Sequence, residues 1–335
     1  MKAIVIRQFG DPSVLNLEDV SQPALEAGEI AIKVRAVTVN QTLDVALRAG
    51  KYARRPPLPH VPGCDVAGVV TAVGSAVTTV AVGDEVVVNP AVSPIADIEK
   101  WGNDSPMGPG FMIYGEHCWG GHAETAIAPE RNVRKRPSTR TWAECAAFPL
   151  AYLTAYRMLR RARLRSGDTL LVVGIGSGVS CAALALGTTM GARVEVTSRS
   201  ENKQAQALSM GAAAAHDSAA AKWPVEADVV VESVGPATWD QSVRSLKPGG
   251  RMVVCGSTSG PKVELMLPRL FFKQFEIIGS SMGSNQEFDE LLALVDSGLP
   301  ITIDQEYPLQ GYEDALARLE HGEQLGKIVL NHEGS

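Results

Sequence analysis

The sequence predicts an α/β protein of two domains, a compact all-β unit followed by a doubly wound parallel sheet. At 335 residues the chain is too long for one small core and suits two domains of ordinary size. Up to about Glu124, short apolar or alternating runs are separated by Gly, Pro and Asp, which is typical of an all-β unit. After Trp142 helical and strand patterns alternate, which predicts a parallel sheet covered by helices.

The first part of the chain is expected to form a barrel-like unit from short strands at Lys2–Ile6, Glu29–Val39, Val66–Val73 and Glu85–Val88. Residues 89–114 are rich in Pro, Gly and small polar residues, and they exceed the length of most connections. We expect them to form either a functional lobe or a mobile loop.

The second part is expected to contain helices at 142–162, 179–190, 201–210 and 238–245, and strands at 169–173, 193–197, 228–231, 251–254 and 275–278. The alanine-rich stretch 211–221 is low in complexity and is expected to be a surface turn. A strand at 301–307, a helix at 312–321 and a strand at 327–330 are then expected to complete the first domain.

The most informative segment for function is a glycine loop between the strand at 169–173 and the helix that follows it. Such a loop presents bare backbone N–H groups at the positive end of a helix, which binds phosphate without a charged side chain. Gly174 and Gly176 fit the Gly-x-Gly pattern, although a valine stands at the third glycine position. We therefore predict that a dinucleotide binds here, with a nucleotide-free α/β turn as the alternative. The predicted contacts are Gly176, Ser177, Gly178 and Val179.

The end of the next strand predicts which dinucleotide binds. Ser198-Arg199-Ser200 stands where an acidic residue would bind a ribose 2′-hydroxyl. Hydroxyls and a guanidinium suit a 2′-phosphate instead, so the sequence predicts NADPH. Lys203 is expected either to join Arg199 on that phosphate or to lie on a solvated helix face.

Composition argues against several other partners. The net charge of −6 comes from 31 basic and 37 acidic residues without a dense basic cluster, so we expect no nucleic acid. No apolar run approaches the ~20 residues that span a bilayer, so we expect no membrane. The amino end meets a charge and a glycine too early for a signal peptide, which leaves the cytoplasm. The five cysteines are scattered without a Cys-x-x-Cys pair, as fits reduced thiols.

Further motifs follow one another along the whole chain: "VTVNQTLDVALRAGKY", "PPLPHVPGCDVAGVVTAVG", "VGDEVVV", "GGHAETAIAP", "AAFPLAYLTAYRML", "RSGDTLLVVGIGSGVS", "LKPGGRMVVCGSTSG" and "EQLGKIVL". In this order and spacing they resemble the medium-chain dehydrogenase/reductase superfamily, and within it the zinc-free quinone oxidoreductase (ζ-crystallin-like) branch. The resemblance implies a GroES-like β-barrel catalytic domain at 1–127, completed by 300–335, and a Rossmann NADP-binding domain at 128–299.

The positions of the metal ligands separate the zinc and the metal-free branches of this superfamily. Gln41 stands where the zinc branch has a cysteine, and Cys64 stands where it has a histidine. Residues 89–114, which correspond to the lobe with four cysteines in zinc enzymes, contain none. A structural zinc site needs four N or S ligands, so we expect no metal. The other candidates are interpreted as packing and turn residues, because their spacing matches no zinc pattern: His60, His117, Cys118 and His122.

The resemblance also suggests substrate residues. Tyr52 matches a tyrosine that lines the quinone pocket, with a surface-loop tyrosine as the alternative. Asn40 matches an asparagine near the substrate carbonyl; its alignment against Gln41 stays open, and a turn-capping side chain is the alternative. Ala46 replaces a second tyrosine, which implies a roomier or less polar pocket. Asp44 and Asp65 are expected to accept backbone N–H bonds in a barrel turn rather than to act as acids.

Further cofactor contacts are expected around the nicotinamide. Thr154 matches a threonine that contacts this region in relatives, with a core position as the alternative. Open α/β sheets bind ligands at the carboxyl ends of their strands. The residues expected there are Gly256, Ser257, Ser280 and Met282.

The expected function is therefore hydride transfer from NADPH to a quinone or an α,β-unsaturated carbonyl without a metal. Two alternatives remain: an alcohol dehydrogenase with an atypical metal site at Cys64, and a cofactor-binding structural or RNA-binding protein. In relatives the sixth-strand region pairs across a twofold axis. The apolar segment "PKVELMLPRLFFKQFEIIGS" therefore predicts a homodimer, with Phe271, Phe272 and Ile277 as contacts.

Overall fold

The computed structural model describes residues 1–52 and 54–332, and the chain divides into two compact units. The first unit contains Met1–Leu150, Gly283–Ser297 and the residues from Thr302 onward; the second contains Ala151–Met282 and Gly298–Ile301. This division differs from the expected boundaries at 127/128 and 299/300, because residues 128–150 and 283–297 pack with the first unit. No helix of the described residues is long and apolar enough to cross a membrane.

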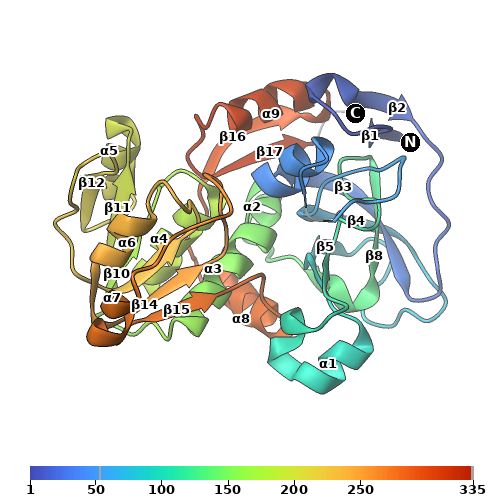
Figure 1. Cartoon of the computed structure of the whole chain (residues 1–335). Coiled ribbons are helices and arrows are strands. Elements are labelled where there is room, and N and C mark those ends of the chain that lie inside the picture. Colours follow the sequence, from blue (N-terminus) through green and yellow to red (C-terminus); the bar gives the residue numbers. More distant parts are fainter. Residues whose placement is uncertain (53, 333–335) are drawn as a thin grey trace. The chain divides into compact units, whose positions relative to one another are not determined.

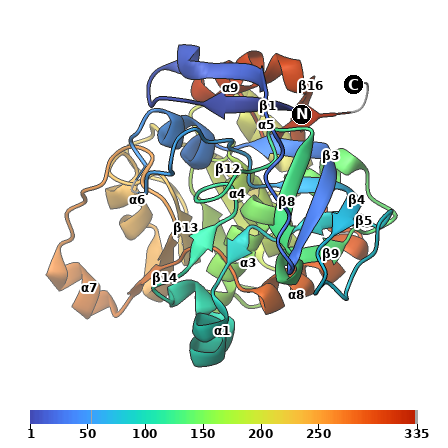
Figure 2. The same cartoon turned by 90° about the vertical axis from the view of Figure 1, so that its right-hand side faces the viewer.

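The first unit is built on a sheet that branches at its longest strand, β3 (Glu29–Val39). The sheet is ordered β16-β17-β3-β4-β5-β9, and β8 also pairs with β3 (Figures 1 and 2). Along this path the bounds are β16 (Ile303–Pro308), β17 (Lys327–Asn331), β4 (Val66–Val73), β5 (Glu85–Val88), β9 (Val133–Lys135) and β8 (Thr125–Pro129). The four strands predicted in this part have the observed bounds, and the final strands return as predicted. The strand path is open, so the expected barrel is not closed.

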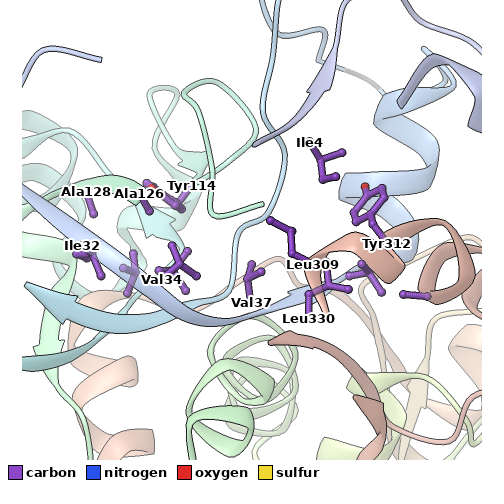
Figure 3. Packing of buried hydrophobic residues seen from close by; sticks show 14 of the residues in the cluster. Ile4, Ile32, Val34, Val37, Tyr114, Ala126, Ala128, Leu309, Tyr312 and Leu330 are labelled. Carbon is purple, nitrogen blue, oxygen red and sulfur yellow. The ribbon is translucent and has the colours of Figure 1, made fainter. Parts of the chain in front are cut away.

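The core of the first unit lies against β3 (Figure 3). A bulge between Val34 and Ala36 shifts the alternation of β3 by one residue. As a result Ile32, Val34 and Val37 all belong to one buried cluster, together with Leu330 of β17. A buried apolar strand at the centre of a sheet explains why the sequence of β3 is almost continuously hydrophobic.

The remaining elements of the first unit are helices and short strands around this sheet. Residues 89–114 form a small structured lobe, in which the hairpin of β6 (Ala91–Val92) and β7 (Met112–Ile113) encloses α1 (Ile95–Trp101) and the 3-10 segment η3 (Gly102–Met107). The others are β1 (Lys2–Ile6), η1 (Pro12–Val14), β2 (Leu15–Asp19), η2 (Gln41–Ala46), η4 (Glu130–Asn132), α2 (Trp142–Ala147), α8 (Asn285–Asp296), η5 (Leu309–Gly311) and α9 (Tyr312–Glu320).

The second unit is a parallel sheet ordered β12-β11-β10-β13-β14-β15 (Figure 1). The strand order reverses direction at β10, the switch point where open α/β sheets bind ligands. The strands are β10 (Thr169–Val172), β11 (Arg193–Ser198), β12 (Ala214–Asp217), β13 (Ala227–Glu232), β14 (Leu246–Val254) and β15 (Glu276–Gly279). The helices are α3 (Pro149–Arg161, entering from the first unit), α4 (Gly178–Thr189), α5 (Glu201–Ser209), α6 (Trp239–Arg244) and α7 (Leu267–Lys273).

Two predicted elements differ from the structure in more than their bounds. The helix expected at 142–162 is broken at Phe148, because Pro149 has no N–H to continue α2 but fits the first position of α3. The alanine-rich stretch 211–221 is not only a surface turn: Ala214–Asp217 forms the edge strand β12. Its backbone completes hydrogen bonds that β11 would otherwise leave unpaired, so pairing overrides the weak strand propensity of alanine.

Candidate active site

A cluster of polar side chains in the first unit gathers where three strand ends meet. Asn40 follows β3, Cys64 and Asp65 precede β4, and Lys327 opens β17. The pairing of Val37 with Val66 and of Val39 with Ile328 brings these ends together at one edge of the sheet. With Thr38 of β3 these residues are called the Asn40 cluster below.

Asp65 is the centre of the Asn40 cluster. Its side chain is fully buried, and Oδ2 accepts hydrogen bonds from Thr38 Oγ1 (2.5 Å), Asn40 Nδ2 (3.0 Å) and Lys327 Nζ (3.1 Å). Oδ1 accepts the backbone N–H of Leu150 at 2.7 Å. The prediction that Asp65 accepts a backbone N–H is therefore confirmed, and four donors fully satisfy the buried carboxylate.

Asn40 is half-buried, and both ends of its amide have partners in the cluster. Oδ1 accepts from Lys327 Nζ, and Nδ2 donates to Asp65 Oδ2 and lies 3.2 Å from Cys64 Sγ. Gln41, the alternative in the sequence alignment, is exposed. The structure therefore places Asn40, and not the exposed Gln41, in this cluster.

Lys327 is the cluster member that sequence reasoning missed. Its side chain is 4% exposed and forms an ion pair with Asp65. The available signal was a lysine at the head of the apolar run "KIVL", because a lysine is almost never buried unless it is paired. Its partner stands 262 residues away in the sequence, so the pair could not be recognised from spacing.

Asp44 stands on η2, four residues after Asn40, and is fully buried. Its Oδ2 accepts the backbone N–H of Asn40, which confirms the predicted structural role. Burial raises the pKa of Asp44 to about 7. Its other oxygen, Oδ1, has no hydrogen-bond partner among the described residues and faces His122 Nδ1 at 3.8 Å.

Tyr52 is half-buried and packs against the core of the first unit, so it is not a surface-loop tyrosine. Burial, and secondarily the charge of Glu116, raises the pKa of Tyr52 to about 12, so the phenol stays protonated at neutral pH. No hydrogen bond between the described residues joins Tyr52 to the Asn40 cluster.

The candidate metal ligands of the first unit do not fit a zinc ion. The Cys64 thiol is buried, and Asn40 Nδ2 lies 3.2 Å from its sulfur. His60 Nε2 lies 2.9 Å from the Gly115 carbonyl, His117 Nδ1 lies 3.1 Å from Ile113 O, and His122 Nε2 lies 3.1 Å from Thr38 O. Within residues 1–52 and 54–332, no three His, Cys, Asp or Glu side chains are grouped as metal ligands.

The glycine loop of the second unit turns tightly from β10 into α4. Gly174 and Gly176 have φ angles of 73° and 148°, which side-chain-bearing residues rarely adopt. Ser177 caps α4 by accepting the N–H of Ser180 at 3.1 Å. The first amides of a helix have no intrahelical acceptor, so those of Gly178 and Val179 are available to an anion.

The valine at the third glycine position does not hold α4 away from the sheet. The close approach occurs further along the helix, at Gly187, where an added Cβ would lie 2.6 Å from Leu170 Cδ2 and 3.0 Å from Val194 Cγ2. Gly187 thus provides the tight contact of helix with sheet that the third glycine supplies in the standard motif.

The turn after β11 presents donors without an acidic group. Ser198 Oγ accepts the N–H of Ser200, and Ser200 Oγ caps α5 by accepting the N–H of Lys203. Each hydroxyl keeps its own hydrogen for another acceptor. Arg199 is exposed, and no other described residue forms a hydrogen bond or ion pair with it. Lys203 is half-buried on the first turn of α5.

The other predicted cofactor residues also belong to the second unit. Gly256 and Ser257 follow β14, and Ser280 follows β15 with its N–H bonded to Val254 O at 2.8 Å. Because the strands are parallel, these residues lie at the same edge of the sheet as the glycine loop. Met282 is buried just beyond them, and Thr154 is half-buried on α3.

Comparisons with known proteins cover nearly the whole chain. A family model described as "Alcohol dehydrogenase GroES-like domain" matches residues 26–138, and one described as "Zinc-binding dehydrogenase" matches residues 178–297. A quinone oxidoreductase of Lama guanicoe is 32% identical over 98% of this chain and 97% of its own. A 2-methylene-furan-3-one reductase of Solanum lycopersicum is 31% identical over 99% of this chain and 79% of its own. The solved structure of an NAD-dependent alcohol dehydrogenase matches with a TM-score of 0.92 and 34% identity over 99% of both chains.

Proposed function

The chain belongs to the medium-chain dehydrogenase/reductase superfamily, in its quinone oxidoreductase branch, and we propose that it is a metal-free, NADPH-dependent reductase of quinones or α,β-unsaturated carbonyls. The observation that carries the proposal is the Asn40 cluster. At the place where the zinc branch holds its metal, this chain has a buried thiol and a buried ion pair, Asp65 with Lys327.

The second unit supplies the residues that would hold the cofactor. The free amides of Gly178 and Val179 suit the pyrophosphate, and the hydroxyls of Ser198 and Ser200 with the guanidinium of Arg199 suit a 2′-phosphate. Bound NADPH would supply a hydride, and with it two electrons, to the acceptor. The remaining predicted contacts, around the nicotinamide, are Thr154, Lys203, Gly256, Ser257, Ser280 and Met282.

The proposed class of acceptor follows from the kinds of side chain that the first unit places at its polar cluster. Oxidation of an alcohol requires removal of the hydroxyl proton, which a zinc ion assists as a Lewis acid. Within the part of the chain that the structure describes, no three His, Cys, Asp or Glu side chains are grouped to hold such a metal, and the imidazoles lie at hydrogen-bond distance from backbone carbonyls. Reduction of a quinone or an enone needs only a hydrogen-bond donor at the oxygen where charge develops. Asn40 and Tyr52 are proposed to line the acceptor.

A screen of NADPH oxidation at 340 nm tests the proposal against its alternatives. We expect turnover with quinones or small enones, none with simple alcohols and NADP⁺, and no loss of activity after chelation. Stoichiometric zinc with activity lost on chelation would support an alcohol dehydrogenase, which is what one of the similar solved structures is named. Tight NADPH binding without turnover of any acceptor would support a structural role.

The proposal includes a homodimer that forms through the second unit. β15 is the last strand of its sheet, so one edge of its backbone is unpaired by the described residues. The neighbouring helix α7 exposes Phe271 (58%) and Phe272 (79%), and Met266 (72%) is exposed just before its first residue. An apolar surface beside an open strand edge suits a second copy of the chain. A monomeric mass by light scattering at micromolar concentration would contradict it.

The cytoplasm is the compartment that suits this proposal. The cysteines are all free thiols in the structure. Such thiols persist where glutathione and thioredoxin keep proteins reduced.

A further inference from the structure

We propose that Lys327 is a further catalytic residue, whose ammonium donates a hydrogen bond to the oxygen of the acceptor while hydride adds to its carbon. Asp65 and Asn40 are the positioning residues that hold this ammonium. The inference rests on the proposed function for the identity of the acceptor, but its structural argument concerns the Asn40 cluster alone.

Lys327 makes fewer hydrogen bonds within the described residues than its ammonium group can donate. An ammonium group has three N–H donors. Within the described residues two acceptors are present, Asn40 Oδ1 and Asp65 Oδ2, the latter at 3.1 Å. The side chain is only 4% exposed, so the third donor is largely withdrawn from bulk water. Leaving a donor unpaired in such a position is costly, and it is this third donor that we assign to the acceptor oxygen.

Asn40, the donor expected from the sequence, is less free than Lys327 to donate to an acceptor. The amide hydrogens of Asn40 are directed toward Asp65 Oδ2 and Cys64 Sγ, at 3.0 and 3.2 Å. Asn40 would have to break one of these contacts to reach an acceptor. Lys327 can donate to the acceptor without breaking either of its bonds in the cluster.

The charges of the Asn40 cluster also favour Lys327 as the donor to the acceptor. Asp65 is satisfied by four donors, one of which is Lys327 Nζ. Burial raises the pKa of Asp44 to about 7, although the charge of Lys327 acts to lower it. This carboxyl is therefore mostly protonated below pH 7. Lys327 therefore carries the one positive charge of the Asn40 cluster. It is the group whose interaction with the acceptor strengthens most as negative charge forms, which is what catalysis requires.

Hydride adds two electrons and one hydrogen to the β-carbon of an enone, the C=C electron pair shifts, and the carbonyl oxygen becomes an enolate. For a quinone the corresponding product is the hydroquinone monoanion. Lys327 donates a hydrogen bond to this oxygen and keeps its proton, and a proton from solvent completes the neutral product.

The test uses the full-length protein with NADP⁺ bound and 4-nitrophenol as the probe, since the phenolate imitates the enolate oxygen and absorbs near 400 nm. Wild type is expected to bind the phenolate roughly 10- to 100-fold more tightly than Lys327→Met does, as fits one charge-assisted hydrogen bond. The matched control is Lys33→Met, which removes the same charge at an exposed position of β3. It should bind like wild type.

Activity provides the second readout. In Lys327→Met the rate constant for hydride transfer should fall by about 100-fold or more, while the Kd for NADPH changes by less than about twofold. Lys327→Arg should restore part of the rate. Because Lys327→Met leaves Asp65 as an unpaired buried charge, the double variant Lys327→Met/Asp65→Asn removes both charges and keeps the fold testable.

Three outcomes overturn the proposal: phenolate binding unchanged in Lys327→Met, a normal rate in the folded double variant, or a loss confined to NADPH affinity. Failure of the proposed function is separate, because it requires that wild type reduce no quinone or enone at all. In that case the phenolate titration still decides the role of Lys327.

Discussion

Asp44 and His122 form a buried pair that holds a single proton in the folded chain. His122 Nε2 lies 3.1 Å from the Thr38 carbonyl, which can only accept, so Nε2 carries the hydrogen and Nδ1 is a lone pair. Nδ1 and Asp44 Oδ1 face each other at 3.8 Å, and neither has another partner among the described residues. Burial raises the pKa of Asp44 to about 7 and lowers that of His122 to about 3. The proton therefore resides on Asp44.

This arrangement predicts that the pair makes stability nearly independent of pH between about pH 4 and 6.5, the ordinary pKa values of Asp and His. Asp44 has a raised pKa, so it binds a proton in the folded state only, and its contribution is lost as pH rises toward 7. His122 has a lowered pKa, so it binds a proton in the unfolded state only, and its contribution is lost as pH falls below 6.5. The two slopes are opposite and cancel.

Single substitutions should expose each slope. Between pH 4.5 and 6.5, the unfolding free energy of Asp44→Asn should fall on acidification by about 1.4 kcal/mol per pH unit relative to wild type. That of His122→Gln should fall by a similar amount as pH rises. Urea denaturation across this range measures both. Curves that run parallel to wild type in both variants would show that the pair does not hold one proton.

The turn 115–122 holds the segment 61–63, which leads to Cys64 and Asp65, in its position. Gly120, Gly121 and His122 donate backbone hydrogen bonds to Val61, Gly63 and Pro62, which stand just before Cys64 and Asp65 in the sequence. A Cβ on Gly120 would lie 2.2 Å from Gly63 O and 2.6 Å from Pro62 O, so only glycine allows the two backbones to approach this closely.

We expect Gly120→Ala to destabilise the protein by about 1–3 kcal/mol, because the atoms it meets are backbone and cannot rotate away. Displacement of Asp65 should also lower activity. The matched control is Gly28→Ala, where nothing lies within 4 Å of the added Cβ. Thermal denaturation of both variants checks this, and equal midpoints would refute the close-approach argument.

The turn between β11 and α5 predicts the choice of cofactor. Arg199 is exposed and has no partner among the described residues, so its removal leaves the fold intact. Arg199→Ala should weaken NADPH binding by about 10-fold or more and leave NADH binding nearly unchanged, because only NADPH loses a charge-assisted contact. Fluorescence titration with each cofactor measures this. An equal loss for both would place the 2′-phosphate elsewhere.

Sequence patterns predicted these elements unevenly, for physical reasons. Strands such as Glu29–Val39 were found because their burial depends on their own side chains. Strand β12 was missed because its partner β11 decides its conformation, not its alanines. Helix α8 was missed although Ser284 and Glu287 form a capping box at its start. Lys327 was missed because only the fold brings it to Asp65.

For the whole molecule, the dimer prediction can be tested by one surface substitution. Phe272 is 79% exposed, so Phe272→Lys should change the unfolding free energy by no more than about 0.5 kcal/mol. It should nevertheless weaken the dimer by about 10-fold or more, because it places a charge in an apolar contact. Val82→Lys, at a position 63% exposed in the first unit, is the control. Sedimentation over a concentration series distinguishes them.

The division into units was also only partly predictable. The return of residues 301–330 to the first unit follows from the sequence of strands and helices. The placement of α8 in that unit depends on interactions between residues far apart in the sequence. Asn285 bonds Asn89 at 2.7 Å, Val295 O accepts from Arg140, and Phe288 stacks on Phe148 at 5.7 Å. Neither composition nor periodicity records such pairs.

The ion pair between Asp65 and Lys327 also determines when the site can exist during synthesis. All of the second unit lies between these two residues in the sequence, and its strands pair with neighbours nearby. We expect it to fold as soon as it leaves the ribosome, whereas the pairing of β3 with β17 must wait until β17 has been made. Until then Asp65 remains hydrated and needs no partner. A nascent chain that stops before residue 327 would therefore acquire the cofactor-binding unit first, and the ability to react last.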